Sequence, residues 1–278
     1  MSPPYVNEKN YIDGLPHIEE LKGNDILTHV EKFKVNYKDK DYKIAFCHKA
    51  PQKRGSLPTP YSEFVNNFIN VNHRFVRSGS VAVDIGAYDG DTSLAISILT
   101  DGGKVFAFEC SPSFSSQLNI NLGLNPSMNI VGCPYAVMEH EGIHQFLYSA
   151  TDDNGGHPST NSWVGTYTVP RLIRAVSFEK FLGPQVNFAD ISFIKIDTEG
   201  HDFHILWSFR DIIKEHRPVI HAEWFPRTHM AIKQLQDYIG YSMYCGYCLE
   251  PLTIYSEWRQ DILLVPDEKI EEFKLRKL

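Results

Sequence analysis

The 278-residue chain is 42% hydrophobic and has a formal net charge of −7, from 27 Lys and Arg against 34 Asp and Glu. This length and apolar content suit a folded domain with a filled core and exclude a disordered chain. The acidic balance excludes the basic surface with which proteins bind duplex nucleic acid, so we expect no nucleic-acid partner.

The cysteines and the first residues bear on the compartment of the protein. Five cysteines are scattered through the chain, which is typical of reduced thiols rather than of a disulfide framework. Cys245 and Cys248 have C-x-x-C spacing, but no second pair accompanies them, and we interpret them as packing residues. The sequence contains neither the apolar core of a signal peptide nor a run of about 18 apolar residues. We therefore expect a cytoplasmic protein without membrane contact.

Along the chain, a polar leader precedes an alternation of strands and helices. Residues 1–58 predict an N-terminal extension, in which residues 34–48 form a small hairpin, and residues 59–278 predict one domain. Strands are expected at 81–85, 104–109, 129–137, 143–149, 163–169, 192–197, 218–224, 241–247 and 261–266. Helices are expected at 61–77, 91–99, from Pro112 on, between 198 and 214, and at 228–239. This alternation predicts an α/β fold with a doubly wound, mostly parallel sheet covered by helices on both faces.

The turn after the first of these sheet strands is the most informative segment. It reads DIGAYDGDT, residues 84–92. In an open α/β sheet such a turn lies at the ligand-binding crevice. Gly86 and Gly90 permit positive φ, but their G-x-x-x-G spacing is not the G-x-G-x-x-G of nicotinamide dehydrogenases. Because three aspartates in this segment would repel phosphate, the turn favours a cationic ligand without phosphate.

A further acidic residue, Glu109, ends the second sheet strand. A carboxylate at this place can accept hydrogen bonds from both hydroxyls of a ribose, each contributing about 1.5–3 kcal/mol. A cationic, ribose-bearing ligand without phosphate describes S-adenosylmethionine (SAM), whose amino group and sulfonium suit an acidic turn. The alternative is that these acids are ordinary loop and helix-start residues, placed by helix dipoles alone.

Four segments together resemble the FkbM family of class I methyltransferases: VAVDIGAYDGDT, FAFECSP, ISFIKIDTEGHD and RPVIHAE. The similarity covers about residues 60–225, and the I-K-I-D-x-E-G block at 194–200 is its most specific part. The resemblance implies a Rossmann-like sheet of seven strands, a methyltransferase domain over 59–278, and methyl transfer from SAM. The acceptor it implies is a hydroxyl of a small molecule, sugar or polysaccharide.

From the turn and the resemblance together we expect the SAM-binding residues to be Asp84, Gly86, Ala87, Tyr88, Asp89, Gly90, Glu109, Cys110, Ser111 and Asp197. The loop 150–162 is expected to close over the acceptor. The expected partner is a small-molecule or carbohydrate acceptor, and a homo-oligomer remains among the expected assemblies.

Methyl transfer to a hydroxyl requires alignment of the reactants and a base. Asp197 and Glu199 follow the strand at 192–197, and His221 and Glu223 share one face of the next strand by the two-residue period. We take these four as candidate catalytic residues, with His221 or Asp197 as general base. Lys195 lies in a strand predicted to be buried and should pair with a carboxylate, for which Glu223 is a candidate.

Several alternatives stay open at this point. The same nitrogen and oxygen groups could hold a divalent metal ion that acidifies the acceptor hydroxyl. His221 could be an ordinary core histidine, and His201 and His204 are expected to be surface or helix-capping residues. The protein could also bind SAM without turnover, or methylate a different nucleophile. A nucleic-acid methyltransferase would favour an N/D-P-P-Y block where residues 197–200 read DTEG.

Overall fold

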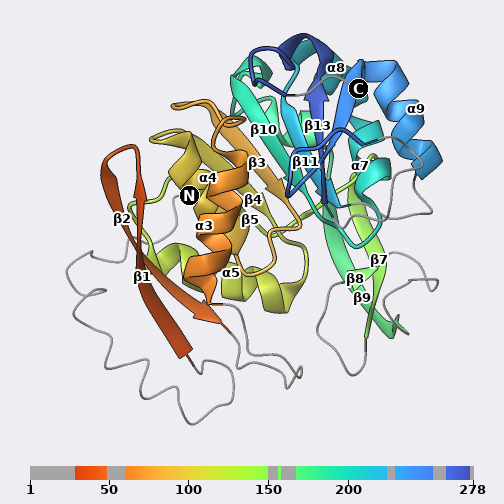
Figure 1. The fold of residues 1–278 in the computed structure, drawn as a ribbon. Helices are drawn as coiled ribbons and strands as arrows, with labels where there is room; N and C mark the ends of the chain where they lie inside the picture. Colours follow the sequence, from red (N-terminus) through yellow and green to blue (C-terminus); the bar gives the residue numbers. More distant parts are fainter. Residues whose placement is uncertain are drawn as a thin grey trace.

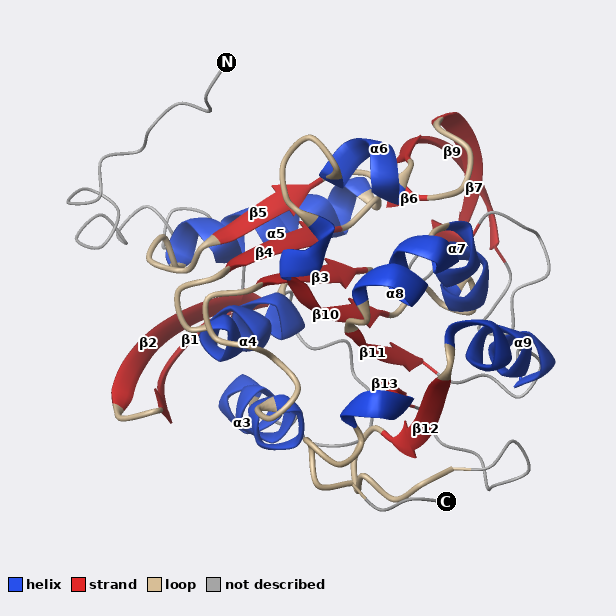
Figure 2. Cartoon of the chain, turned by 90° about the horizontal axis from the view of Figure 1, so that it is seen from above, coloured by secondary structure: helices blue, strands red, loops and turns tan. Residues whose placement is uncertain are grey.

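The computed structural model describes residues 29–48, 60–149, 156–157, 167–223, 229–252 and 261–275. Its centre is a sheet of seven strands (Figures 1 and 2). From one edge to the other these are β12 (Tyr241–Cys245), β13 (Asp261–Pro266), β11 (Val219–Glu223), β10 (Ile191–Ile196), β3 (Val81–Ile85), β4 (Lys104–Phe108) and β5 (Ile130–Cys133). The strands from β11 to β5 run parallel, and β13 is antiparallel to both of its neighbours. The predicted doubly wound, mostly parallel sheet is confirmed.

Helices cover both faces of this sheet, because successive apolar residues along its strands point to opposite faces. The helices are α3 (Tyr61–Asn72), α4 (Asp91–Thr100), α5 (Pro112–Leu124), α6 (Phe178–Leu182), α7 (Asp202–Ser208), α8 (Arg210–His216) and α9 (His229–Ile239). Ala82 and Phe193 pack in one core layer with residues of α3 and α4. Val83 and Ile194 face the other layer, with residues of α6 to α9. Because α4 is apolar around most of its circumference, it is buried between the sheet and its neighbours.

The predicted N-terminal hairpin is present and is longer than expected. Its strands are β1 (His29–Tyr37) and β2 (Lys40–His48), joined by Lys38 and Asp39. Both turn residues have positive φ, as a two-residue hairpin turn of matching twist requires. Ile44 and Phe46 are buried in the same core layer as α3 and α4. Figure 1 shows the hairpin at one edge of the molecule, beside α3 and α5.

Several predicted elements differ from the structure. The helix expected at 61–77 ends at Asn72, and the strand expected at 163–169 is described from Tyr167 and continues to Val176. The strand expected at 129–137 is divided into β5 and β6 (Ala136–Val137), and β6 joins a second sheet with β9 (Tyr167–Val176), β7 (Gly142–Ser149) and β8 (Gly156–His157). The helix expected up to residue 214 is two helices, because the backbone leaves helical geometry at Phe209, with φ −125°. The strand expected through residue 197 ends at Ile196.

Some predictions fall outside the described residues. These are the boundary at residue 58 and most of the loop 150–162. No disulfide joins any two of the five cysteines, all of which the structure describes. Within the described ranges, no helix combines the length and the apolar character needed to cross a membrane.

Candidate active site

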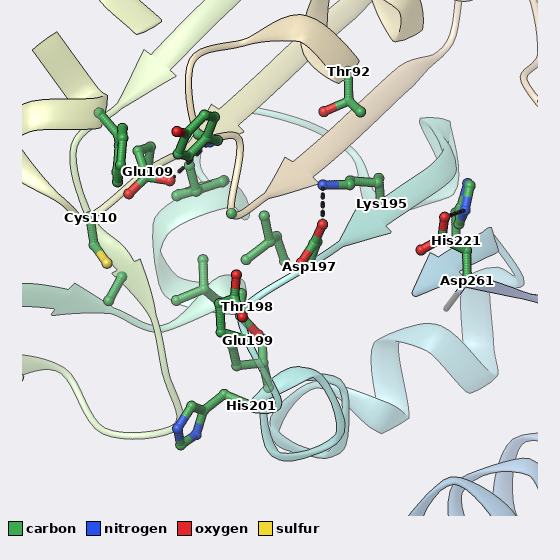
Figure 3. A pocket seen from close by; sticks show the side chains of 18 of the residues that line it. Thr92, Glu109, Cys110, Lys195, Asp197, Thr198, Glu199, His201, His221 and Asp261 are labelled. Atoms are coloured by element: carbon green, nitrogen blue, oxygen red, sulfur yellow. Dashed lines mark hydrogen bonds and ion pairs between the residues drawn. The ribbon is translucent and has the colours of Figure 1, made fainter. Parts of the chain in front are cut away.

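The candidate site lies where the order of the strands reverses. From β3 the chain proceeds through β4 to β5 in one direction, and from β10 it proceeds to β11 in the other. Ligands of open α/β sheets bind at such a switch point, beyond the carboxyl ends of the strands. A cavity of about 1140 Å³ occurs here, and Figure 3 shows it from close by. Its described lining includes residues that follow β3, β4 and β10, one residue of β11 and the first residue of β13.

The two glycines of the turn are required by neighbouring protein atoms. Gly86 has φ +81°, and a Cβ there would lie 1.8 Å from the backbone oxygen of Asp197. The Asp197 amide in turn donates to the carbonyl of Ile85 at 3.0 Å. Gly90 has φ +93°, and its Cβ would lie 2.7 Å from Leu118 of α5. At both positions the space for a side chain is thus taken by the protein itself, although Gly86 also lines the cavity.

A row of buried polar side chains crosses the sheet beneath the cavity. Asp84, Lys195 and His221 are register partners on β3, β10 and β11, so they share one face of the sheet. Asp84 is wholly buried and accepts hydrogen bonds from the hydroxyls of Thr92 at 2.8 Å and Ser93 at 2.6 Å. It is absent from the described lining of the cavity. Asp84 was predicted as a ligand contact, and in the structure its carboxylate holds the first turn of α4 instead of facing the described part of the cavity.

Lys195 is the one lysine among the described lining residues, which include no arginine. Its Nζ lies 3.3 Å from Asp197 Oδ2, as Figure 3 shows. The same atom lies 3.8 Å from Asp84 Oδ1. Glu223 was the predicted partner of Lys195, but the acids next to Nζ are Asp197 and Asp84. Asp84 is there because it is the register partner of Lys195 on β3. Burial lowers the pKa of Lys195, but Asp197, Asp84 and Asp91 together raise it above its ordinary value. Lys195 is therefore a permanent cation at the base of the site.

Glu109 lines the cavity just beyond the end of β4 and is held by two backbone amides. Its Oε2 accepts from the Tyr88 amide at 2.9 Å, and its Oε1 accepts from the Ser111 amide at 2.7 Å. Burial raises the pKa of this carboxyl to about 7, although the two amides oppose the shift. Each oxygen retains a lone pair for a ligand. Tyr88 and Phe114 also line the cavity, and the centroids of their rings lie 4.1 Å apart.

The predicted turn residues differ in how they contribute. Tyr88 and Cys110 line the cavity, whereas Ala87, Asp89, Gly90 and Ser111 are buried and absent from its described lining. Ser111 acts through its amide. Asp91 is one of the three aspartates of the turn but is not among the predicted SAM-binding residues. In the structure it lines the cavity at the start of α4. Burial raises its pKa to about 6, while Lys195 opposes the shift.

His221 lines the cavity on the side away from Glu109, next to a residue that the sequence analysis missed. The imidazole stacks on Phe68 of α3, with ring centroids 5.4 Å apart and an interplanar angle of 7°. Its Nε2 lies 3.9 Å from Oδ2 of Asp261 (Figure 3). Asp261 opens β13, and because that strand is antiparallel, its first residue meets the carboxyl end of β11. Burial opposes ionisation of Asp261, yet His221 and Tyr247 hold the pKa of this carboxyl below its ordinary value.

Four carboxyl groups gather at the carboxyl ends of β10 and β11: Asp197, Glu199, Asp202 and Glu223. Asp197 and Glu199 line the cavity, but the alternation used to place them fails, because the strand has ended and Glu199 has φ +54°. Glu223 is absent from the described lining, so its predicted catalytic role is not supported by contact with the cavity. Burial, followed by the charges of Asp197 and Asp202, raises the pKa of Glu223 to about 10. Because of this raised pKa, Glu223 carries a proton next to Asp197.

Other lining residues had no clear signal in the sequence. His201, His204 and Trp207 line the cavity from α7 and its start. His204 is exposed and His201 is the N-cap residue of α7, as expected for surface or capping residues, although neither was expected at the cavity. One side of α3 also contributes, as does the segment 135–140. These positions depend on how distant segments pack. Among the described residues, no group of three or more His, Cys, Asp or Glu side chains is placed to hold a metal ion.

Comparison with known proteins gives one family. Residues 84–248 match the methyltransferase FkbM domain. No curated protein matches the sequence significantly. A solved structure of methyltransferase FkbM from Methylobacillus flagellatus KT is 16% identical, with a TM-score of 0.45, over 75% of this chain and 56% of that one. The chain therefore spans little more than half the length of that protein.

Two other solved structures are similar at lower identity. Precorrin-6y C5,15-methyltransferase from Geobacter metallireducens GS-15 is 14% identical, with a TM-score of 0.39, over 72% of this chain and 85% of that one. The 16S rRNA N2 G1207 methyltransferase of T. thermophilus, in complex with AdoMet and guanosine, is 10% identical, with a TM-score of 0.41, over 86% of this chain and 51% of that one.

Proposed function

The chain belongs to the methyltransferase FkbM domain family, and from this premise we propose that it methylates a hydroxyl group of a small molecule or carbohydrate, with SAM as methyl donor. One observation carries the proposal: a buried carboxylate, Glu109, faces a cavity at the switch point whose lining is strongly acidic. Six carboxylates line it, set against the single Lys195; they are Asp91, Glu109, Glu139, Asp197, Glu199 and Asp261.

The described residues fit SAM in three respects. Glu109 has a free lone pair on each oxygen for the two ribose hydroxyls. The rings of Tyr88 and Phe114 provide an aromatic wall next to it, which suits a nucleobase. Asp91 and Asp197 supply negative charge for the ammonium and sulfonium groups. When bound, SAM supplies a methyl group already activated by the positive charge of its sulfur.

The cavity also has room for an acceptor. Its volume of about 1140 Å³ exceeds that of most sites for one drug-sized ligand, roughly 300–1,000 Å³. The part lined by His221, Asp261 and Phe68 lies away from Glu109 and is assigned to the acceptor in this proposal. The acidic lining disfavours an anionic acceptor, so a neutral hydroxyl compound is the class that fits best.

Of the two candidate bases, His221 is favoured. The Asp197 carboxylate is already paired with the ammonium group of Lys195, at 3.3 Å. His221 is held by the ring of Phe68, and Asp261 lies 3.9 Å from its Nε2. In the proposed reaction Nε2 takes the hydroxyl proton, and the Asp261 carboxylate stabilises the imidazolium that results. Positioned bases of this kind contribute about 10²–10⁴-fold to the rate.

The test is calorimetry of the full chain with SAM and with S-adenosylhomocysteine, followed by an assay of S-adenosylhomocysteine release with pooled hydroxyl acceptors. We expect binding of both nucleosides and release that depends on the pool. Binding without release from any pool would favour a SAM-binding protein without turnover. Release only with amine or thiol acceptors would show a different nucleophile. Absence of binding would refute the proposal.

A further inference from the structure

The hairpin β1–β2 lies outside the residues that match the family domain, yet polar side chains of α5 tie it to the candidate SAM site. Gln117 and Asn121 of α5 and its C-cap residue Asn125 stand at four-residue intervals, so their carboxamides form a ladder along the helix and its end. All three side chains are buried, with at most 3% exposure. Carboxamides buried to this degree have to be hydrogen-bonded, because an unsatisfied buried polar group is costly.

This amide ladder (Gln117, Asn121, Asn125) pairs with the free edge of β2. Asn125 both accepts from the Ala45 amide at 3.0 Å and donates to the Ala45 carbonyl at 2.7 Å. Asn121 accepts from the Cys47 amide at 2.7 Å, and Gln117 donates to the Cys47 carbonyl at 2.6 Å. The helix thus satisfies backbone groups of the edge strand as a neighbouring strand would.

Asn121 has a second bond, which reaches the glycine turn. Its Nδ2 donates to the backbone carbonyl of Asp89 at 2.7 Å. The side chain is wholly buried, so one carboxamide connects the hairpin to the turn with no solvent between them. The turn residues on either side of Asp89 are close to the cavity, since both Tyr88 and Asp91 line it.

The hairpin reaches the same turn by a second route, through α3. Glu31 of β1 accepts from the amides of Tyr61 and Ser62, at 3.1 and 3.2 Å, and so holds the first turn of α3. The Tyr61 hydroxyl then donates to Asp89 Oδ2 at 3.1 Å. Asp89 is therefore fixed at its carbonyl from α5 and at its carboxylate from α3, and both helices are bound by the hairpin.

We propose that the N-terminal hairpin is a working part of the SAM site, and that Asn121 is the positioning residue through which it holds the turn 86–91 in its binding conformation. The inference rests on the proposed function, because it concerns affinity for SAM. Asn125 provides a matched comparison, since its carboxamide binds the hairpin equally well but does not contact the turn.

The test compares Asn121→Asp, Asn121→Ala and Asn125→Ala in the full chain. Aspartate retains the acceptor for the Cys47 amide, but when ionised it places an oxygen against the Asp89 carbonyl in place of the donor, so it disrupts the bond to the turn while keeping the bond to the hairpin. We expect Asn121→Asp and Asn121→Ala to raise the Kd for SAM about tenfold, as loss of one hydrogen bond implies. Asn125→Ala should lower the melting temperature but change the Kd less than twofold. At saturating SAM, kcat should be unchanged in all three.

A measurement on the unmodified protein covers the case in which the Asn121 variants do not fold. If the hairpin positions the turn, then SAM must stabilise the hairpin to the same extent, because coupling between sites is reciprocal. Hydrogen exchange of the peptide spanning residues 43–48 should slow when SAM is added. An unmodified protein that does not bind SAM would refute the proposed function. SAM binding with equal Kd in the Asn121 and Asn125 variants, or with unchanged exchange at 43–48, would overturn this inference alone.

Discussion

Replacing Glu109 by glutamine probes the proposed contact of this carboxylate with the ribose of SAM. The substitution keeps the size of the side chain but removes its charge. It also places an NH₂ group where one carboxylate oxygen now accepts either the Tyr88 amide, at 2.9 Å, or the Ser111 amide, at 2.7 Å. One of these two amides therefore loses its acceptor, and the ribose hydroxyls lose a charged one.

The magnitude follows from these contacts. Hydrogen bonds to a charged acceptor contribute roughly 1.5–3 kcal/mol, against roughly 0.5–1.5 kcal/mol for a neutral one. Two ribose hydroxyls should therefore lose about 2–3 kcal/mol together, which corresponds to a Kd for SAM raised about 30- to 150-fold. The unpaired buried amide should lower the free energy of unfolding by about 1–3 kcal/mol.

The assay is calorimetric titration with SAM at pH 8, where Glu109, with its pKa of about 7, is largely ionised in the unmodified protein. Urea denaturation of the same samples measures the free energy of unfolding. Glu179→Gln, at an exposed position on α6, is the control for removal of one negative charge. A Kd for Glu109→Gln within threefold of that of the control would refute the assignment of Glu109 to the ribose.

Three further predictions concern charge in and beneath the cavity. Burial raises the pKa of Glu109 to about 7 and of Asp91 to about 6, so the contribution of these two groups to the stability of the free protein should be greatest below pH 4 and should be lost as the pH rises through 6 to 7. Affinity for the cationic SAM should increase over the same pH range. Thermal denaturation with and without SAM from pH 5 to 8 measures both the stability and the affinity. An affinity for SAM that does not depend on pH would contradict this prediction. Lys195→Met leaves Asp84 buried with no cation near it and should lower the free energy of unfolding by about 3–5 kcal/mol in urea denaturation, whereas a loss under 1 kcal/mol would show that Asp84 is satisfied by hydroxyls alone. His221→Gln should reduce kcat about 10²–10⁴-fold with little change in the Kd for SAM, and near-normal turnover would exclude His221 as the base.

Local patterns were sufficient to predict most elements. The strands β3 and β4 and the start of α5 at Pro112 lie within one residue of the predicted positions. Gly86 and Gly90 do have the positive φ that their place in the turn indicated. Strand and turn preferences depend on a few adjacent residues, so they can be read without knowledge of the fold.

The predictions that failed depended on contacts between distant segments. Glu223 was selected as the partner of Lys195 because its strand follows in the chain, yet the register of β3 against β10 places Asp84 directly opposite. Asp261 was not considered, since only the antiparallel direction of β13 brings it to His221. The N-terminal extension was expected to hold a small hairpin, and only the structure shows that this hairpin contacts α3 and α5.

The sequence by itself determined the order of strands and helices, the acidic glycine turn and the carboxylate at the end of β4. These features depend on residue types within a short stretch of chain. Only the tertiary structure decided which charges meet, which of the candidate residues face the cavity, and that the hairpin supports the turn. The physical reason is that register, strand direction and helix docking are set by packing between segments far apart in the chain, and neither partner in such a contact encodes it alone.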